Sequence, residues 1–305
     1  MSLIEKALDK ARVGGERDMP RDAPRDAPQL AVRRASAAPA PLASRVTESP
    51  KLMVDDAFLR SVGLRAPAEQ LHQQMAEYRH IKRQLLTTML NPSEPDKARI
   101  VLVSSAVAGD GKTFSATNLA LSLALEPDFA VLLVDADIIK TSLSRAFGIA
   151  DRKGLMDATA NPSIDVESLV LSTSMEGLSI LPAGHPHPNA TELFGSVRMQ
   201  QIMQKLVSAP NRIVVIDSLP LLLTTEVRSL IQHAGQVLLV VRADYTPQNA
   251  VHQSLDLLDG HENVQLMLNA AVRTRLTDYY SYSNGYNYTY GAAEALAAGK
   301  GKENG

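Results

Sequence analysis

The residues best suited to chemistry in this chain form a short glycine-rich segment, Ser-Ser-Ala-Val-Ala-Gly-Asp-Gly-Lys-Thr, at positions 104–113. An apolar run at 99–103 precedes the segment, and a stretch with helical spacing at 114–125 follows it. Glycines let a backbone approach phosphate closely, and the start of a helix presents free N–H groups to an anion. The segment therefore predicts a phosphate-binding loop, although Ala106 stands where the usual pattern has its first glycine.

Within this loop, Lys112 is predicted to be catalytic because its ammonium can reach the β- and γ-phosphates of a nucleoside triphosphate. The hydroxyl of Thr113 is predicted to hold Mg²⁺. The full set of residues expected to bind ATP is Ala108, Gly109, Asp110, Gly111, Lys112, Thr113 and Phe114.

Two further apolar runs end in aspartate, at Asp135 and at Asp217. Mg²⁺ prefers oxygen ligands, so both carboxylates are predicted to belong to its site together with Thr113. An aspartate after a strand is also a common turn or capping residue, which is the alternative for each. Asp137 lies two positions after Asp135, and in an extended chain the two side chains share one side. Asp137 is therefore predicted to accept a proton from an attacking hydroxyl, as a kinase requires.

The elements that must position these residues alternate along the chain. Strand-like runs occur at 99–103, 130–134, 178–182, 212–216, 236–242 and 264–269, and helical spacing occurs at 67–89, 114–125, 196–207, 225–234 and 247–258. Alternating strands and helices predict an α/β fold of the P-loop NTPase type, with a mostly parallel sheet covered by helices on both faces. Ligands of such sheets bind at the carboxyl ends of the strands.

Composition narrows the function classes. The formal net charge is −2, and no basic stripe with interleaved aromatics is present, so nucleic acid is not expected as a partner. The chain has no cysteine, which excludes disulfides and fits the cytoplasm. Its apolar runs are shorter than the roughly 20 residues of a membrane helix, so we expect no spanning segment.

Three parts are expected along the chain. Residues 1–66 would hold a short N-terminal helix and a disordered linker rich in Pro and Ala, residues 67–275 the P-loop domain, and residues 276–305 a flexible tail. The tail carries six of the eight tyrosines: Tyr279, Tyr280, Tyr282, Tyr286, Tyr288 and Tyr290. The alternative is that the tail is only adhesive and that its tyrosines take part in no reaction.

Together, the loop, the Val-Asp-Ala-Asp run ending at Asp137, the Val-Ile-Asp-Ser-Leu-Pro run ending at Pro220 and the tyrosine cluster resemble the bacterial tyrosine autokinases of exopolysaccharide and capsule assembly. The similarity is greatest to the exosortase-associated branch.

This resemblance implies autophosphorylation of the tail tyrosines in trans, with ATP and Mg²⁺. It implies a ring-like homo-oligomer with Arg79 and Lys82 at its contacts, and a membrane-bound regulator of polysaccharide chain length as partner. The protein would then lie peripherally at the inner face of the plasma membrane.

The sequence departs from the family pattern at Ala76, Asp110, Ile139 and Leu219. These departures leave open the alternative that the protein is a nucleotide-binding adaptor of the export complex with little kinase activity. A partition or positioning ATPase is the other alternative, but such proteins carry an early loop lysine where this chain has Val107.

Overall fold

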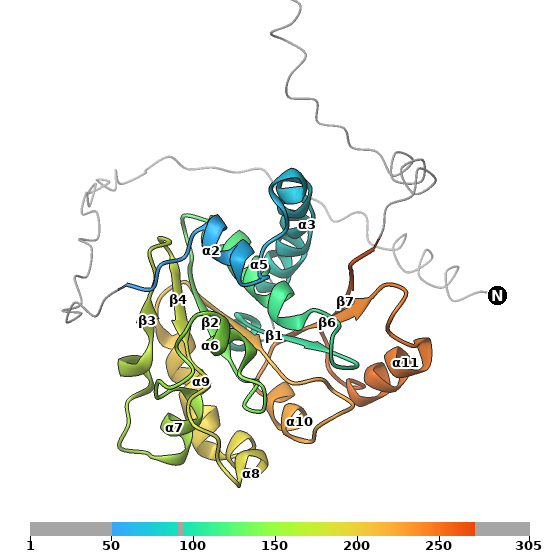
Figure 1. The fold of residues 1–305 in the computed structure, drawn as a ribbon. Coiled ribbons are helices and arrows are strands. Elements are labelled where there is room, and N and C mark those ends of the chain that lie inside the picture. Colours follow the sequence, from blue (N-terminus) through green and yellow to red (C-terminus); the bar gives the residue numbers. More distant parts are fainter. Residues whose placement is uncertain (1–50, 91–93, 272–305) are drawn as a thin grey trace, which may run out of the picture. The chain divides into compact units, whose positions relative to one another are not determined.

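The computed structural model describes residues 51–90 and 94–271 (Figure 1). Its strands are β1 (Ile100–Ser105), β2 (Ala130–Asp135), β3 (Leu171–Ser172), β4 (Leu178–Leu181), β5 (Arg212–Asp217), β6 (Gln236–Arg242) and β7 (Val264–Asn269). They form one sheet in the order β3-β4-β2-β5-β1-β6-β7. Every neighbouring pair is parallel except β3 with β4. The predicted, mostly parallel sheet is confirmed, and the two-residue β3 is an addition that the sequence pattern did not indicate.

The helices follow the expected alternation. The α-helices are α2 (Asp56–Ser61), α3 (Leu71–Leu90), α4 (Pro95–Ala98), α5 (Lys112–Ala124), α6 (Ser142–Ala146), α7 (Leu155–Ala160), α8 (Ala190–Phe194), α9 (Val197–Ser208), α10 (Glu226–Ile231) and α11 (Gln248–Leu257). Two 3₁₀ turns, η1 (Ala68–Gln70) and η2 (Val166–Leu169), precede α3 and β3. In the described part of the chain, no helix is both long and apolar enough to cross a bilayer.

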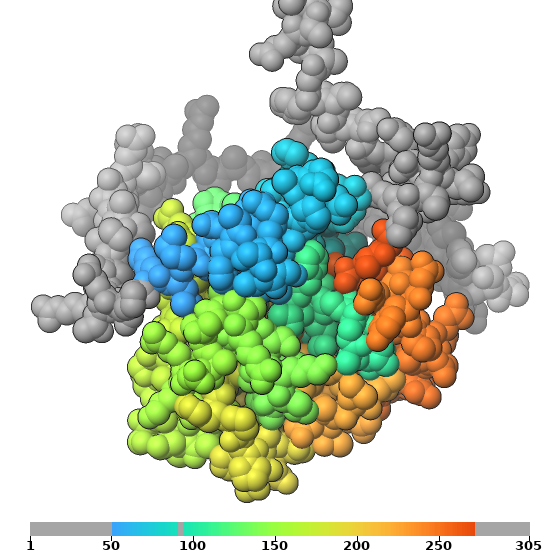
Figure 2. Space-filling model, in the orientation of Figure 1, coloured from blue at the N-terminus to red at the C-terminus, as the bar shows by residue number. Residues whose placement is uncertain are grey.

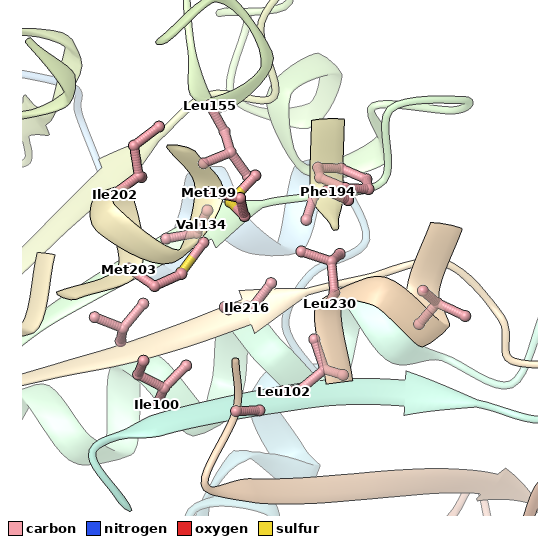
Figure 3. Packing of buried hydrophobic residues seen from close by; sticks show 14 of the residues in the cluster. Ile100, Leu102, Val134, Leu155, Phe194, Met199, Ile202, Met203, Ile216 and Leu230 are labelled. Carbon is pink, nitrogen blue, oxygen red and sulfur yellow. The ribbon is translucent and has the colours of Figure 1, made fainter. Parts of the chain in front are cut away.

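The central strands are buried on both faces, which explains their continuous apolar runs. Val101 and Val103 of β1 pack toward α2, α3, α5 and α6, whereas Ile100 and Leu102 pack toward α7, α8, α9 and α10. Figure 3 shows the second of these cores, where Phe194 and Met199 are fully buried against the sheet. Alternate side chains of each strand thus enter opposite cores, because successive Cβ atoms point to opposite faces.

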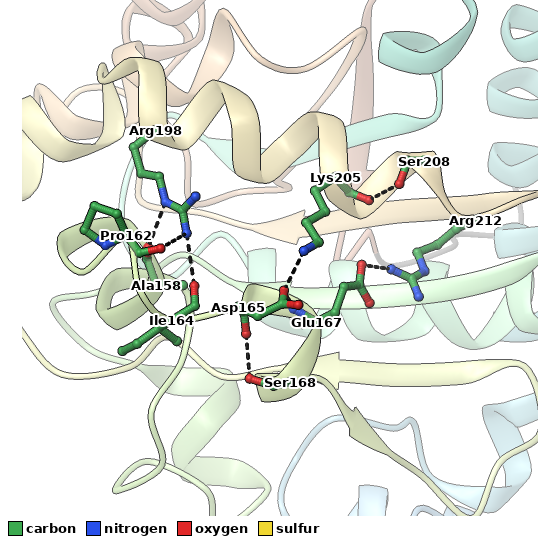
Figure 4. Close-up of polar contacts among 10 residues, drawn as sticks. All are labelled: Ala158, Pro162, Ile164, Asp165, Glu167, Ser168, Arg198, Lys205, Ser208 and Arg212. Carbon is green, nitrogen blue, oxygen red and sulfur yellow. Dashed lines mark hydrogen bonds and ion pairs between the residues drawn. The ribbon is translucent and has the colours of Figure 1, made fainter. Parts of the chain in front are cut away.

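Helix α9 is also fixed to its neighbours by charged contacts (Figure 4). The Lys205 ammonium of α9 pairs with Asp165 at 2.8 Å, and beside it the Arg212 guanidinium, at the start of β5, pairs with Glu167 of η2 at 2.6 Å. Arg198 donates to the backbone carbonyl oxygens of residues 158 and 164. These contacts lie away from the carboxyl ends of the strands, and they hold the face opposite α3 and α5 in place.

Residues 51–66, which the sequence analysis assigned to the linker, pack onto the α3–α5 face. Leu59 and Leu64 are 1% and 5% exposed and belong to the same apolar core as α5. Helix α2 is capped by Asp55, whose carboxylate accepts from the Phe58 N–H at 2.7 Å. The segment between α2 and α3 therefore packs beside α5.

Candidate nucleotide-binding site

The predicted phosphate-binding loop lies between β1 and α5, at the carboxyl end of the central strand. Gly109 and Gly111 have φ angles of 92° and 96°, in the left-handed region that favours glycine. Gly111 is the N-cap of α5, so Lys112 and Thr113 occupy its first turn. The first N–H groups of a helix have no partner within the helix, and here they face the loop that precedes α5.

A cavity of about 500 Å³ opens at this loop. Its lining consists of loop and helix residues 108, 109 and 111–114, residues 137, 139, 140, 142 and 146 after β2, residues 219, 220, 223 and 224 after β5, and residues 62–64 before α3. Figure 2 shows the teal loop region between the green residues that follow β2 and the orange C-terminal strands. Six of the seven residues predicted to bind ATP line this cavity, and Asp110 is the exception.

Among the described residues, Lys112 is one of two lysines, with Lys140, that line the cavity. It is 8% exposed, and burial lowers the pKa of its ammonium. The carboxylates of Asp217, Asp137 and Asp110 act in the opposite direction and favour the charged form. The three acidic residues therefore lie close enough to Lys112 to interact with it electrostatically, which brings the predicted catalytic lysine and its carboxylates to one place.

Asp135 and Asp217 face each other as register partners on neighbouring strands β2 and β5. Burial raises the pKa of Asp135 to about 6, against the opposing effect of hydrogen bonds from Ser144. The Ser144 hydroxyl and N–H donate to one carboxylate oxygen of Asp135 at 2.6 and 2.8 Å. The N–H of Asp137 donates to the other oxygen at 3.1 Å. Asp135 is thus held firmly from the side of α6.

The Asp217 carboxylate, in contrast to that of Asp135, is not held by hydrogen bonds in the part of the chain that the structure describes. It is 0% exposed, and neither of its carboxylate oxygens has a hydrogen-bond partner among the described residues. Burial raises its pKa well above the ordinary range, and the charge of Asp135 adds to this effect, while Thr113 and Lys112 oppose it. A buried carboxylate without partners is costly unless a cation or a proton compensates it.

This donor set fits a magnesium ion that is bound together with nucleotide. Thr113 lies at the cavity, and the two unpartnered oxygens of Asp217 lie beside it, close to Asp135. Within residues 51–90 and 94–271, no group of three or more His, Cys, Asp or Glu side chains is arranged to hold a metal by itself. Mg²⁺ usually takes only one or two carboxylates and fills its remaining positions with phosphate and water.

Asp137 lines the cavity while Asp135 lies beneath it. The Asp137 carboxylate is 4% exposed and accepts from the Lys140 N–H at 2.9 Å. Its carbonyl oxygen accepts from the N–H of Thr141, a residue with a left-handed φ of 46°. The tight turn after β2 therefore holds Asp137 in the lining of the same cavity as Lys112.

The structure places the two predicted interface cations differently. Arg79 is exposed on α3. Lys82 is 7% exposed, and its ammonium pairs with Glu126 at 2.6 Å and donates to the carbonyl oxygen of Ser122 at 3.0 Å. Lys82 therefore joins α3 to the end of α5 within one chain. The six tail tyrosines lie outside the described residues.

Several site residues were missed by the sequence analysis. Ser144 and residues 62–64 reach the site through tertiary packing, and no local pattern marks them. Thr246, in the turn after β6, and Asn269, at the end of β7, contact Asp110 although they lie far along the chain. The Asn269 side-chain amide donates to the Asp110 carbonyl oxygen at 2.8 Å.

Comparisons with known proteins agree with this site. A family model described as "AAA domain" matches residues 98–273. A putative tyrosine-protein kinase EpsB of Ralstonia nicotianae is 31% identical over 210 residues, and the tyrosine-protein kinase CpsD of Streptococcus agalactiae is 26% identical over 189 residues. These alignments cover 68% and 61% of this chain, and 27% and 81% of the relatives. The chain thus spans about a quarter of EpsB.

Two solved kinase domains have the same fold. The VpsO kinase domain is 27% identical with a TM-score of 0.56, and the alignment covers 68% of this chain and all of that domain. The kinase domain of the Escherichia coli tyrosine kinase ETK is 24% identical with a TM-score of 0.59, covering 70% of this chain and 81% of that one. The expected P-loop fold and the resemblance to bacterial tyrosine kinases are therefore confirmed.

Proposed function

This chain belongs to the AAA domain family, and on that premise we propose that it is an ATP-dependent protein-tyrosine kinase that acts in exopolysaccharide or capsule assembly. The observation that carries the proposal is that Lys112 and Asp137 line one cavity at the loop, with the buried pair Asp135 and Asp217 next to them. The relatives named as tyrosine-protein kinases support the same activity.

In this mechanism, the loop N–H groups and Lys112 bind the triphosphate of ATP and orient its γ-phosphoryl group. Thr113, Asp135 and Asp217 would hold Mg²⁺, which when bound neutralises charge on the phosphates. Asp137 accepts the proton of the incoming tyrosine hydroxyl, whose ordinary pKa near 10 makes it a poor nucleophile without a base. The tyrosine oxygen forms a bond to the γ-phosphorus as the bond to ADP breaks, so ADP and phosphotyrosine are the products.

We place the acceptors in the tail, at Tyr279, Tyr280, Tyr282, Tyr286, Tyr288 and Tyr290, and propose that a neighbouring subunit phosphorylates them. A tether raises the effective concentration of several tyrosines at one site without requiring a folded substrate. Each phosphate adds about −1.5 to −2 charges, so accumulation in one tail favours separation of the subunits. Arg79 is the remaining exposed candidate for the subunit contact.

A membrane-bound chain-length regulator is the proposed partner, and through it the protein would lie at the inner face of the plasma membrane. The family resemblance is the support for this partner.

The proposed activity is tested by incubating wild type, Lys112→Met and Asp137→Asn with ATP and Mg²⁺ and mapping phosphate by mass spectrometry. We expect phosphotyrosine within 279–290 in the wild type only. A second reaction mixes Lys112→Met, as acceptor, with a wild-type chain whose six tail tyrosines are replaced by Phe. Phosphate on the Lys112→Met tail indicates transfer in trans. Nucleotide binding without any phosphotyrosine would favour the adaptor alternative and refute the kinase.

A further inference from the structure

Four side chains hold the phosphate-binding loop from outside the cavity. Arg242, Tyr245 and Thr246 come from the end of β6 and the turn toward α11, and Asn269 comes from the end of β7. We call these four residues the clamp. None of them is among the residues that line the nucleotide cavity. They therefore contact the loop on the side away from the proposed ligand.

The clamp binds three consecutive backbone carbonyl groups. The Tyr245 hydroxyl, the Arg242 guanidinium and the Asn269 amide donate at 3.3, 3.3 and 2.8 Å to the carbonyl oxygens of residues 108, 109 and 110, in that order. The Arg242 guanidinium also stacks on the Tyr245 ring, 4.9 Å from its centroid, which fixes the two donors relative to each other.

These contacts determine where the loop N–H groups point. In a trans peptide unit, the carbonyl of one residue and the N–H of the next are directed oppositely. Carbonyls 108–110 are held toward the clamp, so the N–H groups of residues 109–111 are directed away from it, toward the cavity side. Ordered N–H groups of this kind bind phosphate oxygens.

The Asp110 carboxylate connects the loop to the clamp a second time. It is 0% exposed and accepts from the N–H of Val107 at 3.1 Å and from the hydroxyl of Thr246 at 2.8 Å. The same hydroxyl accepts from the backbone N–H of Arg242 at 2.9 Å. Thr246 therefore joins a buried loop carboxylate to the backbone at the end of β6.

The approach of the clamp is close enough to restrict the loop sequence. A Cβ atom at Gly109 would lie 3.2 Å from the Tyr245 hydroxyl oxygen, and one at Gly111 would overlap the Asn269 amide nitrogen. These two glycines are therefore required both by their positive φ angles and by the clamp side chains packed against them.

We propose that the clamp is a positioning device that presets the loop N–H groups for the phosphate chain of a nucleotide. This inference rests on the proposed nucleotide site and assigns a role there to residues outside the loop motif. A loop that is already ordered before binding loses less conformational freedom on binding phosphate. The clamp residues then act through the loop and touch no reacting atom.

The test is the dissociation constant of ATP with Mg²⁺, measured by calorimetry for the wild type and for Thr246→Val, Thr246→Ser and Tyr245→Phe. Loss of a hydrogen bond to a buried carboxylate predicts at least about tenfold weaker binding for Thr246→Val. Thr246→Ser keeps the hydroxyl and should bind within about threefold of the wild type. Thr87→Val removes a hydroxyl whose bond to Arg83 lies on exposed α3, and it should leave binding unchanged.

Hydrogen exchange of the amides at 107–111 supplies a second readout, which does not depend on activity. Faster exchange of these amides in nucleotide-free Tyr245→Phe, with the exchange of β1 unchanged, supports the clamp even if Thr246→Val folds poorly. If the wild type binds ATP and both Thr246→Val and Tyr245→Phe bind equally tightly with unchanged exchange, the clamp is refuted. If the wild type binds no nucleotide, the proposed function itself fails.

Discussion

Replacing Asp217 by Asn should stabilise the protein without nucleotide and abolish its activity. Asp217 and Asp135 are register partners on adjacent strands, which lie about 4.8 Å apart. Two charges at about 5 Å repel by about 3 kcal/mol at an effective dielectric constant near 20. The new amide remains buried without partners, which costs about 1 to 3 kcal/mol. The net expectation is a gain of up to about 2 kcal/mol in the free energy of unfolding.

The assay is urea and thermal unfolding at pH 7.5 with a chelator present. For a domain of this size, the expected gain raises the thermal midpoint by up to about 8 °C. Because the folded-state pKa of Asp217 is raised, the wild type gains stability as the pH falls, so the difference between the two proteins should shrink at pH 5. Asp128→Asn removes an exposed carboxylate and serves as the matched control.

Addition of ATP and Mg²⁺ separates the structural effect from the functional one. The wild type should gain stability from the ligand, whereas Asp217→Asn should gain much less. If Asp217→Asn is less stable than the wild type at pH 7.5 in chelator, the negative charge of Asp217 is already balanced by neighbouring groups in the free protein, and this prediction is wrong. Equal stabilisation of both proteins by ATP and Mg²⁺ would remove Asp217 from the metal site.

Three further predictions concern a buried carboxyl, a glycine and α3. Titration of metal-free protein by carboxyl NMR should give Asp135 a pKa near 6. The raised pKa then contributes about 3 kcal/mol to the free energy of unfolding below about pH 4, and this contribution is lost as the pH rises through 6. A measured pKa near 4 would contradict this prediction. Gly154→Ala should cost about 1 to 3 kcal/mol in urea unfolding, because its Cβ would overlap the Pro182 carbonyl. At Gly195 a Cβ would make only ordinary van der Waals contacts, so Gly195→Ala should change stability by less than about 1 kcal/mol; equal effects would refute this packing. Lys82→Met should lower stability by about 1 to 3 kcal/mol and leave the oligomeric state, measured by light scattering, unchanged. Arg79→Ala should change the oligomeric state but not the stability. The reverse pattern would show that Lys82 lies at the subunit interface.

The strands and the chemical residues of the site could be predicted from the sequence because both depend on local signals. A buried parallel strand needs a continuous apolar run, and the carboxyl end of such a strand is where Asp135 and Asp217 must lie. Lys112 and the glycines carry their own pattern, since few residue types can form a loop with these φ angles.

The residues that support the site could not be predicted in the same way. Ser144 and Thr246 are ordinary polar residues, and their roles depend on which carboxylate the fold brings next to them. The family resemblance implied that Lys82 lies at a subunit contact, and a sequence pattern gives the position of a residue on a helix but not the reach of its side chain. The long stem of Lys82 crosses to Glu126 at the end of α5. Residues 52–64 lie in short segments that are buried only because they pack against α3 and α5. Local hydrophobic periodicity does not reveal such packing.

The central claim is that a single cavity transfers the γ-phosphoryl group of ATP to tyrosine. A single-turnover reaction with γ-labelled ATP and Mg²⁺, in which the label is partitioned between protein tyrosine and free phosphate, tests this claim most directly. We predict that the label appears on tyrosine in the wild type and is absent from tyrosine in Lys112→Met. Label recovered only as inorganic phosphate would identify an ATPase and contradict the kinase assignment.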